Sequence, residues 1–202
     1  MPAKQTAFLA FGATILFWCS LIGFAALNPR YSHFTKSVSE LGAWGAPNMW
    51  AFNILGFIGP GLLLALFGLN LARYASPRNW LTAGLLVLSG SCLALAGLSP
   101  ADMSNFASPT TIGHLVGSNG NALFWMLSTI ALAIAARKSW PKLSMSSAFA
   151  LALMVAAFSL YFWSEVPRAI VQRIGFGVLF GWYVGAAVLL IGRDKKADPV
   201  AR

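Results

Sequence analysis

Charge is scarce in this chain of 202 residues. Only 9% of the residues are charged, against roughly 25% in an ordinary soluble domain. Hydrophobic residues make up 58% of the chain, and a water-soluble protein of this size needs far more charge to cover its surface. The composition therefore excludes a soluble globular protein and predicts that most apolar side chains face lipid.

Cysteine and histidine are also rare. The two cysteines, Cys19 and Cys92, lie inside apolar runs and form no CxxC motif, so the sequence predicts no disulfide framework. The two histidines, His33 and His114, lack the spacing of an HExxH site, and only His114 lies in an apolar run, which argues against bis-histidine haem. No GxSxG, P-loop or Rossmann fingerprint occurs in a usable context. We therefore expect no metal and no cofactor.

Acidic residues number 5 against 14 basic ones, which gives a formal net charge of +9. In a soluble protein this excess would suggest nucleic acid. Here the basic residues are dispersed between apolar runs, and no arginine-rich patch with interleaved aromatics occurs. The expected partner is therefore the lipid bilayer and not a nucleic acid.

A membrane span needs about 20 predominantly apolar residues. Six stretches qualify, and they are residues 7–27, 50–72, 80–99, 113–136, 144–163 and 169–191. The first is longer than the core of a signal peptide and five more follow it, so it is interpreted as a retained anchor. The sequence thus predicts an all-α polytopic membrane protein, with six transmembrane helices in a single domain over residues 1–202.

The basic residues also predict an orientation. Ten of them fall in the N-terminus, the second and fourth connections and the C-terminal tail, and the other four, on the opposite side, are Arg30, Lys36, Arg168 and Arg173. Because Lys and Arg accumulate on the cytoplasmic side, both termini are expected in the cytoplasm. The protein is then expected to be a multi-pass protein of the inner (plasma) membrane.

Polar residues gather on the predicted outer side. His114, Ser118 and Asn121 are spaced i, i+4 and i+7, so they share one face of the fourth span. Gln172 and Arg173 open the sixth span, and Arg173 lies about 9 Å below Pro167 at 1.5 Å per residue. These groups predict a polar site within the outer half of the helices.

Arg173 is the hardest of these residues to explain by packing alone. An ionised group in hydrocarbon costs about 2.5–3.5 kcal/mol on insertion scales, so it normally faces a partner or a wet cavity. Three acids lie on the same predicted side, Glu40, Asp102 and Glu165. Glu40 is the first candidate for an ion pair with Arg173.

Local structure offers a simpler explanation for several candidates. Ser37 and Glu40 have the spacing of a capping box. Asp102 has the properties of an N-cap or turn residue. Arg168 has the position of an arginine that extends towards lipid phosphates.

The pattern favours an outward-facing, ion-paired pocket that binds or moves a small ligand or an anionic lipid headgroup. Its candidate ligand-binding residues are Ser39, Glu40, Asp102, His114, Ser118, Asn121, Arg168, Gln172 and Arg173. One alternative is an outward-facing hydrolase or transferase, with His114, Glu40 and Asp102 as candidate acids and bases. Another is a structural or partner-binding membrane protein whose polar residues serve helix packing. The sequence decides neither between these functions nor the oligomeric state.

The same residues carry a resemblance to a known family. The segments YSHFTKSVSELGAWGAPN, SPAD, HLVGSNGN and VPRAIVQRIGFG resemble the bacterial and archaeal integral membrane family called domain of unknown function 998. The most specific positions are residues 39–42, Pro100 with Asp102, His114 and residues 172–173. The resemblance implies six membrane helices, and it implies no activity, substrate or catalytic residue.

Overall fold

The structure, a computed structural model, describes residues 1–75, 80–163 and 165–197. These residues form helices and connecting loops, with no strand among them. Six of the helical segments in this part of the chain are long and apolar enough to cross a membrane. The predicted all-α fold with six membrane helices is therefore confirmed.

The six spans lie close to the predicted apolar runs. They are α1 (Ala3–Ala26), the continuous segment α2 (Met49–Phe52), η2 (Asn53–Ile58) and α3 (Gly59–Ala75), then α4 (Trp80–Leu98), α5 (Pro109–Ala135), α6 (Pro141–Trp163) and α7 (Arg168–Ala197). Helix α5 begins four residues earlier than the apolar run because Ser108 caps it. The hydroxyl of Ser108 accepts the backbone N–H of Thr111 at 3.2 Å, and Pro109 occupies the first helical position.

The second span contains a widened turn that the apolar pattern did not predict. Residues Asn53–Ile58 form a π-helical turn, and Gly59 and Pro60 follow it directly. Proline has no N–H to donate to the preceding turn, and π turns occur where the regular helical hydrogen-bond pattern is interrupted. The turn places Asn53 at the base of the loop described below.

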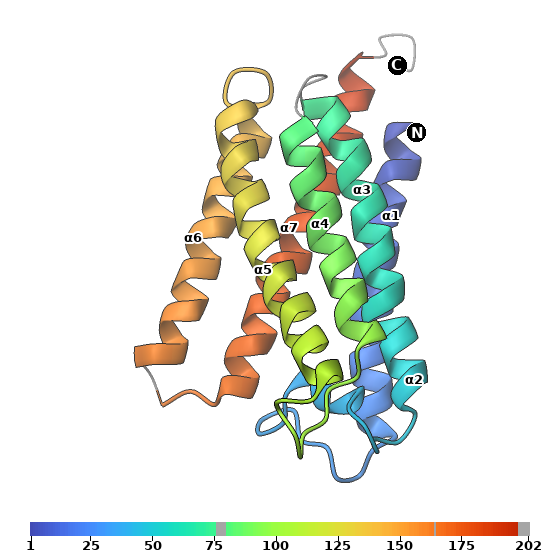
Figure 1. Cartoon of the computed structure of the whole chain (residues 1–202). Helices are drawn as coiled ribbons and strands as arrows, with labels where there is room; N and C mark the ends of the chain where they lie inside the picture. Colours follow the sequence, from blue (N-terminus) through green and yellow to red (C-terminus); the bar gives the residue numbers. More distant parts are fainter. Residues whose placement is uncertain (76–79, 164, 198–202) are drawn as a thin grey trace.

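The spanning helices run alongside one another (Figure 1), and each makes its most extensive contacts with two others, so that the main contacts close into a ring. Helix α1 packs between α3 and α7, α4 packs between α3 and α5, and α6 packs between α5 and α7. The bulkiest fully buried side chains of the described residues are aromatic, and include Phe17, Phe67, Trp125, Phe180 and Tyr183. The rings of Phe17 and Phe180 stack with centroids 4.4 Å apart, which joins α1 to α7.

Glycines bring α4 close to both of its neighbours. A Cβ atom on Gly61 of α3 would lie 2.6 Å from the carbonyl oxygen of Gly90, and one on Gly117 of α5 would lie 2.5 Å from the nitrogen of Ala96. Only glycine fits such contacts, and small residues of this kind let membrane helices approach backbone to backbone. The α3–α4–α5 side of the ring is therefore tightly packed.

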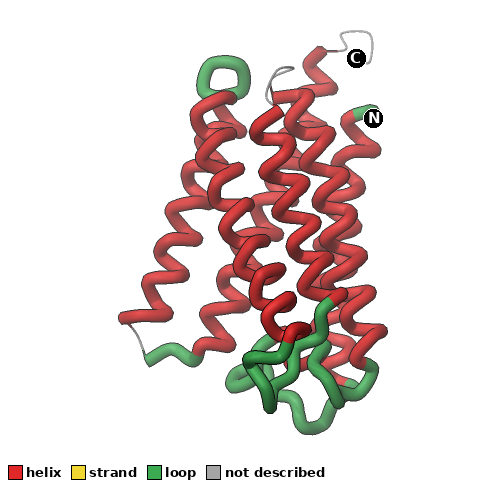
Figure 2. Tube along the Cα trace, viewed as in Figure 1, coloured by secondary structure: helices red, strands yellow, loops and turns green. Residues whose placement is uncertain are grey.

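The long connections gather at one end of the bundle. Segments 27–48 and 99–108 lie together there, opposite the N-terminus and the last described turn of α7 (Figures 1 and 2). We call this the loop end. The short 3₁₀ helix η1 (Val38–Leu41) lies within its first segment. An even number of spans puts both chain ends on one side of a membrane, and the cytoplasmic location of that side stays a prediction.

Candidate functional site

The contacts of Glu40 shape the start of helix η1 at the loop end. The Glu40 carboxylate accepts the backbone N–H of Ser37 at 2.9 Å and its hydroxyl at 3.3 Å, which confirms the capping box predicted from the sequence. The other carboxylate oxygen lies 3.5 Å from Nζ of Lys36. Glu40 is thus occupied by its own turn and by a residue four positions earlier.

Two side chains near the start of helix α7 bind the segment that carries η1. The side-chain oxygen of Gln172 accepts the N–H of Val38 at 2.8 Å. Arg173 Nη1 donates to the carbonyl oxygens of Lys36 at 3.0 Å and Ala169 at 2.7 Å, and Nη2 donates to the hydroxyl of Tyr31 at 2.5 Å. The hydrogen-bond partners of this guanidinium in the described part of the chain are therefore neutral oxygens.

The expected ion pair between Arg173 and Glu40 is not formed. The one ion pair among the described residues joins Lys36 to Glu40. The capping interaction draws the carboxylate towards the start of η1, whereas the first turns of α7 direct the guanidinium to main-chain carbonyls. Nε of Arg173 is buried and has no hydrogen-bond partner among the described residues. Within this part of the chain, the Arg173 charge is consequently not paired with a carboxylate.

Tyr31, which the sequence analysis did not select, links the loop to this charge. Its hydroxyl donates to the carbonyl of Ser37 at 3.0 Å while accepting from Arg173. Burial raises the pKa of Tyr31, and the Arg173 charge opposes that shift, so the phenol keeps its proton. Burial, assisted by the same charge, lowers the pKa of His33. The Arg173 charge therefore acts on two aromatic side chains of the loop.

His114 holds η1 from α5. Its Nε2 lies 2.8 Å from the hydroxyl oxygen of Ser39, and its Nδ1 lies 2.8 Å from the carbonyl oxygen of Ala96 on α4. Asn53, at the widened turn of the second span, donates to the carbonyl of Gly42 at 2.9 Å. Side chains from three different spans thus fix the short segment that carries Ser39.

The predicted stripe on the fourth span does not line a common cavity. Asn121 donates to the carbonyl and the hydroxyl of Ser89 on α4, at 3.0 and 3.1 Å, and its own carbonyl accepts the Ser89 hydroxyl at 3.0 Å. Ser118 donates to the carbonyl oxygen of Leu115 in its own helix, at 3.3 Å. The structure therefore places Asn121 in the contact between α4 and α5 and separates both residues from η1.

Asp102 and Arg168 lie at the same end but apart from η1. The Asp102 carboxylate accepts the N–H and hydroxyl of Ser104 at 2.9 and 2.6 Å, and these hydrogen bonds hold the pKa of Asp102 below its usual value. The guanidinium of Arg168 lies 4.9 Å from the ring centre of Tyr161 on α6. In the described chain no group of three His, Cys, Asp or Glu side chains could hold a metal ion.

A polar hollow of about 260 Å³ opens beside η1. Its lining includes Arg30, Tyr31, Lys36, Glu40 and Trp44. Of these five residues, which all come from the loop that follows the first span, only Glu40 is a candidate predicted from the sequence. The backbone N–H of Trp44 donates to the carbonyl of Ala101 at 2.9 Å, which fixes one wall to the second long connection.

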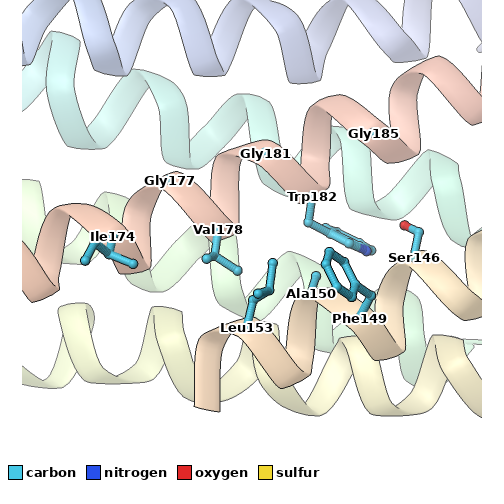
Figure 3. A pocket seen from close by; sticks show the side chains of 10 residues that line it. All are labelled: Ser146, Phe149, Ala150, Leu153, Ile174, Gly177, Val178, Gly181, Trp182 and Gly185. Atoms are coloured by element: carbon cyan, nitrogen blue, oxygen red, sulfur yellow. The ribbon is translucent and has the colours of Figure 1, made fainter. Parts of the chain in front are cut away.

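A larger apolar hollow lies between α6 and α7. It has a volume of about 420 Å³ and is lined by side chains of both helices together with three glycines of α7, Gly177, Gly181 and Gly185 (Figure 3). A Cβ atom on any of these glycines would meet no atom within 4 Å. The hollow has no charged side chain in its lining, so its surface matches hydrocarbon.

Comparison with known proteins agrees with this architecture without adding an activity. No curated protein and no solved structure matches the chain. The family described as "Protein of unknown function (DUF998)" matches residues 11–189, which include all six spans in whole or in large part and every residue of η1. The chain is a multi-pass membrane protein and belongs to the DUF998 family.

Proposed function

We propose that this membrane protein binds the phosphate-bearing headgroup of an anionic lipid in the polar hollow at the loop end. The observation that carries the proposal is a surplus of positive charge around a preformed hollow at the level where the spans end. The sequence predicts a ligand pocket on the outer side of the membrane. The proposal keeps a ligand pocket but assigns it a lining that shares only Glu40 with the predicted residues.

The charges favour an anion. Arg30 and Lys36 line the hollow, and Arg173 lies beneath the same loop. Glu40, the carboxylate in the lining, already has Lys36 as its partner. Arginine and lysine are the usual partners of phosphate oxygens, and basic pockets among membrane helices bind anionic headgroups.

The walls of the hollow favour a site at the membrane interface. Trp44 is 51% exposed and its ring centre lies 6.5 Å from that of Trp50, which is 46% exposed. Tryptophan is enriched at the level of lipid headgroups because its ring is amphipathic. The cationic side chains therefore lie where a headgroup is available and a hydrocarbon chain can remain in the bilayer.

The loop is also held in shape before any ligand arrives. Gln172 and Arg173 from α7 bind its main chain, and His114 from α5 binds Ser39. A preorganised loop loses less conformational entropy on binding, which raises affinity without additional contacts. In this proposal Gln172, Arg173 and His114 position the loop, while Arg30 and Lys36 contact the anion.

The proposal is tested by thermal unfolding of the purified protein in a nonionic detergent. Three probes are added: dioctanoyl phosphatidylglycerol, dioctanoyl phosphatidylcholine and inorganic phosphate. A ligand at 100 times its Kd stabilises the folded state by about 2.7 kcal/mol, so the anionic lipid should raise the melting temperature and phosphatidylcholine should not. An equal response to both lipids, or a full response to inorganic phosphate alone, contradicts a headgroup site.

A matched pair of arginines provides the control. Arg30 and Arg168 lie at the same end of the protein and are both exposed, but only Arg30 lines the hollow. Arg30→Gln should remove most of the stabilisation by phosphatidylglycerol, and Arg168→Gln should retain it. Equal losses in both variants would mean that the lipid responds to the overall charge and not to the hollow.

A further inference from the structure

Ser39 and His114 have the arrangement of a nucleophile and its base. Nε2 of His114 lies 2.8 Å from Oγ of Ser39, and Nδ1 lies 2.8 Å from the carbonyl oxygen of Ala96. A carbonyl oxygen only accepts hydrogen bonds, so Nδ1 of the neutral ring carries the proton. Nε2 is then left with a lone pair directed at the serine hydroxyl, which donates to it.

The surroundings fix the imidazole in this orientation. His114 is 4% exposed, and its ring lies edge to face with Phe57, with centroids 6.0 Å apart. A base oriented by a third group and in hydrogen-bond contact with a hydroxyl is the general signature of an activated nucleophile. Here the third group is a main-chain carbonyl, which fixes the tautomer in the way a carboxylate does in a catalytic triad.

Ser39 is more accessible than its base. It is half-buried, whereas His114 is buried, and the adjacent residue Glu40 lines the polar hollow. The segment lies at the loop end, where the membrane spans finish and where the carboxylic ester groups of lipids lie between headgroup and hydrocarbon. A carbonyl carbon is the electrophile that a serine hydroxyl with a histidine base attacks.

We propose that Ser39 is a nucleophile, with His114 as its general base, that accepts acyl groups from carboxylic esters of membrane lipids. Oγ of Ser39 bonds to the ester carbonyl carbon while its proton passes to Nε2 of His114. The bond from that carbon to the ester oxygen breaks, and the departing alcohol takes the proton from Nε2. Water then attacks the acyl-serine and gives its proton to Nε2, which returns a proton to Oγ as the carboxylic acid leaves. This chemistry does not depend on whether the hollow binds an anionic headgroup.

The alternative is that the hydrogen bond only fastens η1 to α5. A serine probe distinguishes the two roles in the unaltered protein. An alkyl fluorophosphonate should phosphonylate Oγ of Ser39 with loss of fluoride, and peptide mass spectrometry should locate the adduct there. Ser37, two residues away and hydrogen-bonded to Glu40, should remain unmodified. Absence of an adduct on Ser39 would overturn the proposal.

Replacing the hydroxyl of Ser39 with a thiol tests directly whether His114 accepts a proton from position 39. Ser39→Cys and Ser37→Cys are compared in a background in which Cys19 and Cys92 are alanine, by measuring the rate of iodoacetamide alkylation from pH 5 to 10. A thiol beside a histidine that accepts its proton reacts at lower pH. The midpoint of the profile for Ser39→Cys should therefore lie about one pH unit or more below that for Ser37→Cys. Comparing midpoints, and not absolute rates, removes the effect of unequal access of the reagent to the two thiols.

The histidine must be responsible for the shift. Adding His114→Gln to Ser39→Cys should return the midpoint to that of Ser37→Cys, while the midpoint for Ser37→Cys itself should not move. If Ser39→Cys and Ser37→Cys share one midpoint, or if His114→Gln leaves the Ser39→Cys midpoint unchanged, His114 is not a base for position 39 and the proposal is wrong. The probe experiment uses no variant, so it decides the question even if His114→Gln fails to fold.

Discussion

The loop end and the hollow between α6 and α7 are built in opposite ways, although α7 contributes to both. At the loop end, polar groups from α5, α7 and the second span bind one short segment, at the hydroxyl of Ser39 and at the main chain of Val38 and Gly42. Between α6 and α7, apolar side chains and glycines surround a space of about 420 Å³ (Figure 3). The first region is held by directional contacts and the second is open.

Glycines have different structural roles in α3, α4 and α5 from those in α7. On α3, α4 and α5, glycines allow backbone contact, since a Cβ atom on Gly90 would lie 2.5 Å from the nitrogen of Ala65. On α7, Gly177, Gly181 and Gly185 face open space. A small-residue spacing in a membrane helix therefore does not show by itself whether the helix is already packed. Substitutions at the two kinds of glycine should separate them.

The largest effect is expected for Gly90→Ala. Its new methyl group would overlap the backbone of α3, which cannot move aside without separating two helices. Overpacking of this kind costs about 3 kcal/mol. Unfolding in mixed micelles with increasing dodecyl sulfate should show the loss. A change below about 0.5 kcal/mol would mean that α3 and α4 are not in backbone contact.

Arg173→Gln should have the next largest effect. It removes hydrogen bonds from a charged donor to Lys36 and Tyr31, and we expect a loss of about 2 kcal/mol in the free energy of unfolding. The same micelle titration measures it.

Two double-mutant cycles identify the partners of Arg173. Because Arg173 donates to the Tyr31 hydroxyl, Tyr31→Phe with Arg173→Gln should cost about 1 kcal/mol less than the sum of the single changes. Glu40→Gln with Arg173→Gln should be additive within about 0.5 kcal/mol, because these side chains form no ion pair. The opposite result, coupling to Glu40 and none to Tyr31, would restore the ion pair that the sequence suggested.

Gly181→Ala should have the smallest effect, and the opposite sign to Gly90→Ala. The methyl group would enter open space between α6 and α7, while alanine is up to about 1 kcal/mol more favourable than glycine within a helix. Stability in the micelle titration should stay the same or rise slightly. A marked loss would show that another segment or molecule fills the hollow in the purified protein.

The sequence predicts the fold well because apolar length is a strong signal. All six runs became helices, and the predicted capping box at Ser37 and Glu40 is confirmed. The partners of Arg173 were not predictable, because main-chain carbonyls carry no sequence pattern. The contact between Ser39 and His114 joins residues 75 positions apart, and it depends on how η1 folds back over α5.

The polar hollow was missed for a related reason. Arg30, Tyr31 and Trp44 appear in the sequence as ordinary residues of an interfacial loop, and only the folded loop brings them around one space. Conversely, the spacing of Ser118 and Asn121 puts them on one face of α5, but Asn121 uses that face to pack against α4 and not to line a pocket. Spacing along one helix predicts which residues lie side by side on its surface. It does not predict whether that surface faces a water-filled cavity or another helix.

The most direct test of lipid binding at the loop end is native mass spectrometry of the protein released from membranes that contain phosphatidylglycerol and phosphatidylcholine. The wild-type protein and Arg168→Gln should each retain one phosphatidylglycerol per chain after the detergent is removed, and Arg30→Gln combined with Lys36→Gln should retain none. Retention of the same lipid by all three proteins, or retention of phosphatidylcholine in equal amount, would contradict a headgroup site in the polar hollow.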